Sequence, residues 1–190
     1  VYVQPTRVDL DQGTVVATGG DLDIAIEGNG LLMVGDRGQE PRLTRDGRLS
    51  LNDRGELVLA SNGMPVQSTS GRRIVLDPAL PVEINQQGTI LQGDEEVAQL
   101  RLTAVSDARA LRKEGDSLLR YADGIDPSRP PEVPVTGTVR QRHSESSGVD
   151  PIMAMNSMMN AAKAAQGNLK MMQYHDQLLG QTFNTFARVG

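Results

Sequence analysis

Short alternations of apolar and polar residues run through most of the chain before residue 120. In residues 21–27 the aliphatic side chains of Leu22, Ile24 and Ile26 alternate with mainly acidic neighbours. A period of two places the aliphatic side chains on one face of a strand and the charges on the other. We therefore predict a half-buried strand there. Similar short apolar segments lie at residues 49–51, 57–59, 74–76, 82–84 and 97–102.

Turns that contain glycine separate these segments at short intervals and leave no room for a sizeable helix. Asp46-Gly47 and Asn62-Gly63 accept positive φ angles, so we expect each to form a two-residue hairpin loop. The pattern predicts a mainly β protein, with an antiparallel domain of many short strands and hairpins over residues 21–120. Its core should be aliphatic, because Tyr2 and Tyr121 are the only aromatic residues among residues 1–150.

Two further segments flank this domain. Residues 1–20 are expected to be an extended lead-in, and the absence of a methionine before Val1 suggests that an amino-terminal segment has been removed. Residues 121–149 contain four prolines, which remove backbone donors and disfavour helix. We interpret residues 121–149 as a proline-rich linker and return strand.

The sequence predicts one long carboxyl-terminal helix over residues 150–187. Asp150-Pro151 is a typical helix start, because aspartate is a good N-cap and proline fits the first helical position. Spacings of three and four residues then alternate along a seam, and all of its members except Asp176 are apolar. The seam comprises Met155, Met158, Ala162, Ala165, Leu169, Met172, Asp176, Leu179, Phe183 and Phe186.

Such a seam is typical of a coiled-coil helix that packs against a partner. The rest of the helix carries mainly uncharged amides and hydroxyls, which favours a helix surrounded by other protein. The alternative is a helix folded back on its own domain. Asp176 either fixes the register of the seam or lies at its solvent-exposed end.

Composition and charge exclude several classes of function. The chain has 190 residues, of which 38% are hydrophobic and 23% charged, and its net charge is −5. This acidic balance disfavours a nucleic-acid partner. Residues 151–190 carry a net charge of +2, which leaves −7 for residues 1–150. There is no cysteine, and no apolar run is long enough for a membrane span, so we expect neither thiol chemistry nor membrane insertion.

The candidate chemical motifs are weak. Asp94-Glu95-Glu96 could hold a hard cation, but contiguous carboxylates usually form a solvated acidic turn. His143 has three serines nearby in the sequence, without the strained turn and orienting acid of a catalytic triad. His175 is adjacent to Asp176 and lacks the spacing of a helical metal pair. We expect no catalytic residue, no metal ion, no cofactor and no small-molecule substrate.

Four motifs together resemble the flagellar rod and hook protein family. They are LDIAIEGNG at residues 22–30, LTRDGRLSLNDRGELV at 43–58, LRKEGDSL at 111–118 and ESSGVDP at 145–151. The residues at turns within these motifs, which we call the family-motif turns, are Gly28, Gly30, Arg45, Asp46, Gly47 and Gly55. Within the family, Lys170-Met171-Met172 is more similar to the proximal than to the distal rod protein. Leu31, Leu32 and Leu49 depart from the family pattern, where aromatic residues are usual.

The resemblance implies a structural subunit of the bacterial flagellar basal-body rod that polymerises in the periplasm and transmits torque from motor to hook. Its partners would be other copies of itself, neighbouring rod or hook subunits, and the flagellar type III export apparatus. Within the family an amino-terminal helix pairs with the carboxyl-terminal one, which would supply the seam with a partner. The alternatives are a non-catalytic soluble β binding module that dimerises through its helix, and a hydrolase that uses the acidic loops.

Overall fold

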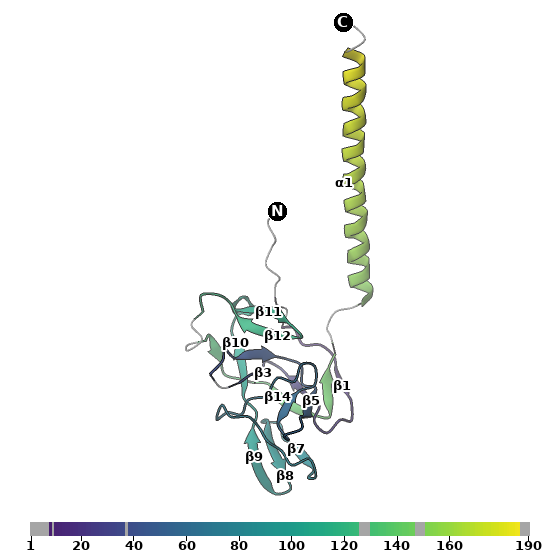
Figure 1. Ribbon diagram of the computed structural model, residues 1–190. Coiled ribbons are helices and arrows are strands. Elements are labelled where there is room, and N and C mark those ends of the chain that lie inside the picture. The colour runs from purple at the N-terminus through teal and green to yellow at the C-terminus, as the bar shows by residue number, and fades with distance from the viewer. Residues whose placement is uncertain (1–7, 9, 37, 126–129, 147–150, 187–190) are drawn as a thin grey trace. The chain divides into compact units, whose positions relative to one another are not determined.

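The computed structural model describes residues 8, 10–36, 38–125, 130–146 and 151–186; within the helix, the side chains of residues 151, 154 and 176–186 are outside the description. The chain divides into two compact units, Val1–Gly148 and Val149–Gly190. The first is a β unit and the second contains one long helix (Figure 1). The prediction of a mainly antiparallel β fold with a single carboxyl-terminal helix is confirmed.

The largest sheet of the β unit has six antiparallel strands in the order β11-β12-β4-β3-β10-β13. In that order the strands are Leu111–Gly115, Leu118–Tyr121, Arg42–Thr44, Leu31–Val34, Leu102–Val105 and Glu132–Val133. The short 3-10 helix η1, Ala108–Ala110, precedes β11. Hairpins join β3 to β4 and β11 to β12, whereas β10 pairs with β3 and β12 with β4 across long stretches of sequence.

The remaining strands form one three-stranded sheet and three antiparallel pairs. The three-stranded sheet is β7-β8-β9, with bounds Val82–Ile84, Thr89–Gln92 and Glu95–Gln99. The pairs are β1 (Val15–Ala17) with β15 (His143–Glu145), β2 (Ile24–Glu27) with β14 (Thr138–Gln141), and β5 (Leu49–Leu51) with β6 (Leu57–Leu59). Residues within 121–149 thus contribute β13, β14 and β15, each paired with a strand from earlier in the chain.

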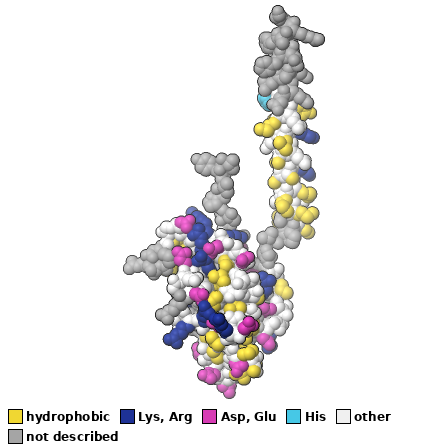
Figure 2. All heavy atoms as spheres, in the orientation of Figure 1, with side chains coloured by type: hydrophobic (Ala, Val, Ile, Leu, Met, Phe, Trp, Pro, Cys, Tyr) yellow, Lys and Arg dark blue, Asp and Glu magenta, His cyan; other side chains and the backbone are white. Residues whose placement is uncertain are grey.

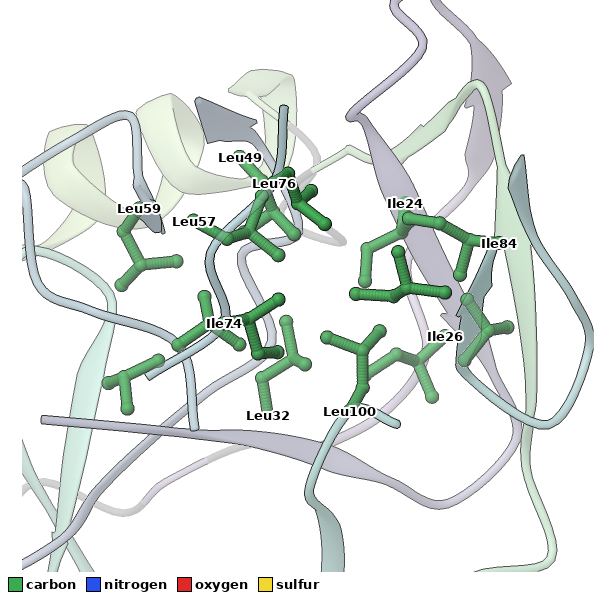
Figure 3. Close-up of a cluster of buried hydrophobic side chains, with 14 of the residues drawn as sticks. Ile24, Ile26, Leu32, Leu49, Leu57, Leu59, Ile74, Leu76, Ile84 and Leu100 are labelled. Atoms are coloured by element: carbon green, nitrogen blue, oxygen red, sulfur yellow. The ribbon is translucent and has the colours of Figure 1, made fainter. Parts of the chain in front are cut away.

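Strand β3 has a hydrophobic cluster on each of its faces. Leu32 and Val34 belong to the larger cluster (Figure 3), whereas Leu31 and Met33 belong to a second one. All four side chains are at most 2% exposed. Aliphatic residues dominate both clusters, as the composition predicts. Leu31, Leu32 and Leu49, at positions where the resemblance implies aromatic residues, are all buried, and Leu49 is 5% exposed.

The prediction of a half-buried strand at residues 21–27 is only partly right. Ile24 and Ile26 are fully buried, but Ala25 between them is fully buried as well. Strand β14 pairs with β2 along its whole length, with Arg140 opposite Ala25. Because alanine is small and apolar, it tolerates burial on the second face of the strand, and within β2 only Glu27 keeps partial contact with solvent.

Neither of the two predicted two-residue hairpin loops is present in the structure. Asp46-Gly47 lies between β4 and β5, which belong to different sheets, so it connects no hairpin. Gly47 lacks a positive φ angle; it is required because an added Cβ would lie 1.9 Å from the carbonyl oxygen of Ile24. Asn62-Gly63 does close a turn, but the loop is longer than two residues, since the N–H of Leu59 donates to the carbonyl of Met64 at 2.9 Å.

The second unit consists of helix α1, Pro151–Phe186, which contains 36 residues. At about 1.5 Å per residue it is roughly 54 Å long. The predicted N-cap, Asp150, lies outside the described residues. A lone helix cannot bury its own side chains, and every described side chain of α1 is exposed.

Candidate assembly surfaces

The side chain of Arg45 donates several hydrogen bonds that join separate segments of the β unit. Its Nε donates to Oε2 of Glu145 at 2.7 Å, and its Nη2 donates to the carbonyl oxygens of Gly28 at 2.8 Å and Ile26 at 3.2 Å. Its Nη1 donates to the carbonyl of Leu10 at 3.3 Å. Arginine suits this position because its planar fork can satisfy several acceptors at once.

Glu145 joins Arg45 to the segment that precedes β1. Its Oε1 accepts a hydrogen bond from the N–H of Gly13 at 2.8 Å, while Oε2 faces Arg45. The side chains of Arg45 and Glu145 are only 17% and 11% exposed. We name Arg45, Glu145 and the carbonyls that Arg45 contacts the Arg45 hub. It joins the segments that enter and leave the β unit to the end of β2.

The entering and leaving segments also pair as strands. Val15, Val16 and Ala17 of β1 lie opposite Glu145, Ser144 and His143 of β15, and the N–H of Ser146 donates to the carbonyl of Thr14 at 2.8 Å. In an antiparallel pair, the chain before β1 and the chain after β15 leave the ribbon at the same end. The Arg45 hub therefore joins this two-stranded ribbon to the rest of the β unit.

Asp46, the next family-motif residue, holds Arg48. The Asp46 carboxylate accepts hydrogen bonds from the backbone N–H and the guanidinium of Arg48 at 2.9–3.1 Å. Burial opposes ionisation of Asp46, but the hydrogen bonds and charge of Arg48 hold the pKa of Asp46 below its usual value. Asp46 is thus a structural residue of the turn that follows β4.

The other family-motif glycines are positions of close approach. An added Cβ at Gly28 would lie 3.1 Å from Cα of Gly137, and one at Gly55 would lie 2.7 Å from the carbonyl oxygen of Leu76. Both have positive φ angles. At Gly30 an added Cβ would lie 2.8 Å from Cγ2 of Ile26. These glycines allow turns to pack directly on the β unit.

Asn29, between Gly28 and Gly30, has a role that the sequence did not reveal. Its Oδ1 accepts hydrogen bonds from N–H and Oγ1 of Thr136 at 2.7 and 2.8 Å, and from N–H of Gly137 at 3.2 Å. The turn after β2 is thereby fastened to the segment that leads into β14. Only the adjacent glycines signalled that a turn lies here.

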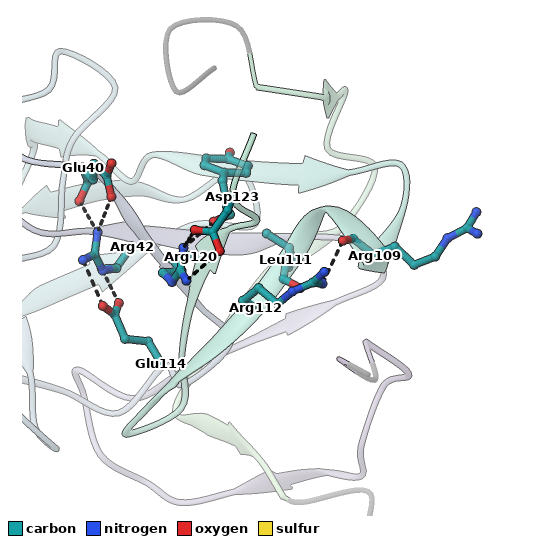
Figure 4. Close-up of polar contacts among 9 residues, drawn as sticks. Glu40, Arg42, Arg109, Leu111, Arg112, Glu114, Arg120 and Asp123 are labelled. Atoms are coloured by element: carbon teal, nitrogen blue, oxygen red, sulfur yellow. Dashed lines mark hydrogen bonds and ion pairs between the residues drawn. The ribbon is translucent and has the colours of Figure 1, made fainter. Parts of the chain in front are cut away.

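A row of arginines crosses one edge of the six-stranded sheet (Figure 4). Arg112 of β11 lies opposite Arg120 of β12, and Arg42 lies on β4, which pairs with β12. Arg42 is paired with Glu114 and with Glu40, and Arg120 is paired with Asp123 at 2.7 Å. These carboxylates offset the repulsion between neighbouring guanidinium groups. The Arg120 side chain holds the pKa of Asp123 below its usual value.

Tyr121 connects this edge to β13. Its hydroxyl donates to Oε1 of Glu132 at 3.0 Å. Burial, followed by the negative charge of Glu132, raises the pKa of Tyr121. The phenol therefore stays neutral and serves as a hydrogen-bond donor.

The predicted seam of α1 is exposed over the part that the structure describes. The exposed fractions are 61% for Met155, 69% for Met158, 61% for Leu169 and 68% for Met172. Ala162 and Ala165 are exposed as well. The side chains of Asp176, Leu179, Phe183 and Phe186 lie outside the described residues. Large exposed apolar patches mark interaction sites.

The candidate chemical residues are dispersed. His143 begins β15, with Nδ1 2.7 Å from the carbonyl oxygen of Gln141, and His175 is exposed on α1. Asp94 lies in the turn between β8 and β9, Glu95 and Glu96 begin β9, and all three are exposed. Over the described residues, no group of three or more His, Asp or Glu side chains could hold a metal ion. None of the described helical segments is long and apolar enough to cross a membrane.

Comparisons with known proteins match two parts of the chain to flagellar families. The flagellar hook protein FlgE/F/G D1 domain matches residues 25–92, and the flagellar basal body rod FlgEFG protein C-terminal family matches residues 140–185. These parts contain Arg45, Glu145 and nearly all of the helix.

Curated relatives include rod proteins of two types. The flagellar basal-body rod protein FlgF of Caulobacter vibrioides is 36% identical over 90% of this chain and 69% of its own length. FlgF of Mesorhizobium japonicum is 31% identical, with 85% and 65% covered. FlgG of Caulobacter vibrioides is 29% identical, with 90% and 67% covered. The chain thus spans about two thirds of the length of these relatives.

The chain belongs to the family of flagellar basal-body rod proteins of the FlgF/FlgG type. This is a family of structural subunits located in the flagellar basal body. The family resemblance predicted from the sequence motifs is therefore confirmed. The relatives are structural rod proteins and not known enzymes, and the alternative of a free binding module is not favoured.

Proposed function

We propose that this chain is a non-catalytic rod subunit that polymerises in the periplasm, with its seam packed against helices of neighbouring subunits, and that the polymer transmits torque from motor to hook. The observation that carries the proposal is the seam of α1. Its large described members, Met155, Met158, Leu169 and Met172, are apolar side chains that a single helix cannot bury. Burial of each large side chain contributes about 1.5–3 kcal/mol, so a repeated seam can stabilise a polymer.

Within the β unit, the segments next to the helix-bearing part of the sequence are tied together. The Arg45 hub joins the segments that enter and leave the unit, and the β1–β15 ribbon pairs them. A mechanical force on the chain at the end of β15 would thereby be transmitted to the end of β2 and to the turn after β4. The family-motif turns at Gly28, Gly30, Arg45, Asp46, Gly47 and Gly55 act as structural residues of the β unit.

We assign the chain to the proximal part of the rod, after export through the flagellar type III apparatus. Support comes from the similarity of Lys170-Met171-Met172 to the proximal rod protein, and from two FlgF relatives that exceed 30% identity. The partners would be copies of this chain and neighbouring rod or hook subunits.

Immunogold labelling of purified basal bodies tests the proposal. Antibody raised against residues 1–150 should place gold on the rod, close to the inner-membrane ring. Gold near the outer end of the rod would contradict the proximal assignment alone. Unlabelled basal bodies from cells that express the protein would overturn the structural role.

A further inference from the structure

Two adjoining hollows on the β unit form a cleft with a positive charge, although the unit as a whole is acidic. The hollows have volumes of about 390 and 320 Å³ and share Asp36, Gln67 and Gly71 in their lining. Arg72 and Arg73 line the first, and Arg101, Thr69 and Ser70 line the second. The lining thus holds three arginines and one carboxylate, that of Asp36. We name it the basic cleft.

The arginines of the basic cleft are not equally occupied. Arg73 is paired with Asp36 at 2.5 Å and with Glu56 at 2.8 Å. Arg72 and Arg101 form no ion pair within the described part of the chain, and Arg72 is exposed. The floor is rigid, because Gln67 is 7% exposed and its Nε2 donates to the carbonyl of Gly35 at 2.9 Å. Two guanidinium groups are therefore available to carboxylates from outside.

The negative charge of the β unit is concentrated in and around the β7-β8-β9 sheet. Residues 74–100 contain no lysine or arginine and hold five carboxylates, which are Asp77, Glu83, Asp94, Glu95 and Glu96. All five are exposed, and none takes part in an ion pair within the described residues. Figure 2 shows acidic side chains at the end of the β unit where Figure 1 labels β8 and β9. We name Asp94–Val97 the acidic tip.

Within the described residues, no carboxylate of the acidic tip forms an ion pair with an arginine of the basic cleft. The cleft adjoins the end of β9, because the N–H of Thr69 donates to the carbonyl of Gln99 at 2.9 Å. Asp94 immediately precedes the same strand and lies roughly 17 Å from Gln99 at about 3.3 Å per residue. Because β9 is paired with β8, it is held extended, and its acidic start is directed away from its end at the cleft. Between two molecules, however, they are complementary.

We propose that the acidic tip of one copy of this chain docks in the basic cleft of a second copy, with its carboxylates on Arg72 and Arg101. Contacts between two different surfaces are heterologous, and when the rotation does not close they generate open helical polymers. This inference rests on the proposed rod function and adds a contact of the β units that is independent of the helix seam. Val97, which is 40% exposed beside the carboxylates, would be covered by the same contact.

The absence of native cysteine makes a disulfide test clean. Purified Ser70→Cys and Val97→Cys chains, distinguished by a mass tag, are mixed at low salt under mild oxidation. Both positions are exposed, and a disulfide requires Cα atoms about 4.4–6.8 Å apart. We expect a mixed dimer that is lost in molar salt, because salt screens exposed charges. Asp53→Cys, in an exposed turn elsewhere, is the matched control for Val97→Cys and should give no mixed dimer.

Charge exchange identifies the contact itself. Arg72→Glu in the Ser70→Cys chain should abolish the mixed dimer, and Glu95→Arg in the Val97→Cys chain should restore it. Unchanged unfolding midpoints show that the variants are folded. A mixed dimer that survives Arg72→Glu would overturn the proposal. So would the absence of any mixed dimer, including the case in which inorganic phosphate binds the cleft and the tip does not.

The outcome is separable from the rod function. If the wild-type protein is found in basal bodies but gives no mixed dimer, only the docking proposal fails. If the mixed dimer forms but the protein is absent from basal bodies, the proposed function fails and the docking describes another assembly.

Discussion

Nε of Arg45 lies 2.7 Å from Oε2 of Glu145, which joins two residues a hundred positions apart in the sequence. Each belongs to a different family motif, and both side chains are largely buried. A buried charge needs a partner, because taking it out of water costs several kcal/mol. This one pair therefore makes the end of β15 depend on the turn that follows β4.

Arg45→Met should destabilise the β unit by about 3 kcal/mol, because it leaves the Glu145 carboxylate buried without its counterion and three carbonyls without a donor. The free energy of unfolding, measured with denaturant, tests this. Arg140→Met is a matched control, since Arg140 and Glu27 are also 2.7 Å apart but 49% and 38% exposed. An exposed pair contributes about 0–1 kcal/mol. Equal losses for both variants would contradict a special role for the Arg45 hub.

Gly47→Ala should destabilise the β unit by more than about 3 kcal/mol, because the new Cβ would meet the backbone of β2 at 1.9 Å. Backbone atoms cannot move aside as a flexible side chain can. Gly63→Ala is the control, since Gly63 has a φ of 72° and nothing within 4 Å of an added Cβ. It should cost only about 1–2 kcal/mol of left-handed strain. If Gly63→Ala proved the more damaging substitution, close packing at Gly47 would be refuted.

Asp46 should give the protein an acid-sensitive contribution to stability. Its pKa is lower in the folded state than the usual value of about 3.9, so the contribution is present above that value and is lost as the pH falls through the folded-state pKa. Thermal unfolding of the wild type and of Asp46→Asn, compared from pH 7 to pH 2, should show a difference in Tm that shrinks below about pH 4. A difference that stays constant with pH would show that Asp46 acts without its charge.

The sequence predicted the local features of this fold better than its long-range pairings. Alternation identified β2, a short apolar segment identified β6, and the seam identified α1, because these patterns depend on neighbours within a few residues. The pairing of β10 with β3 and of β15 with β1 could not be read from the chain, since no local pattern specifies which distant strands meet.

The candidate residues show the same division. Gly47 was correctly singled out, but its function as a close contact with Ile24 replaces the predicted hairpin, because the partner lies in a distant strand. Glu145 lies within a family motif, but the sequence predicted no role for it, since only the fold brings it to Arg45. The basic cleft has no motif at all, because Arg101 lies between β9 and β10 and only the fold brings it beside Arg72 and Arg73.

The central claim is that the seam of α1 holds subunits together, and the most direct measurement is the recovery of variant protein in purified basal bodies. Leu169→Asp in the chromosomal gene should remove the protein from basal bodies and abolish motility, because a carboxylate buried in an apolar contact is strongly destabilising. Asn160→Asp places the same side chain on the opposite side of the helix and should be far less damaging. Circular dichroism of each purified variant should show an intact β unit. Basal bodies that contain Leu169→Asp at the wild-type level, in motile cells, would contradict the account.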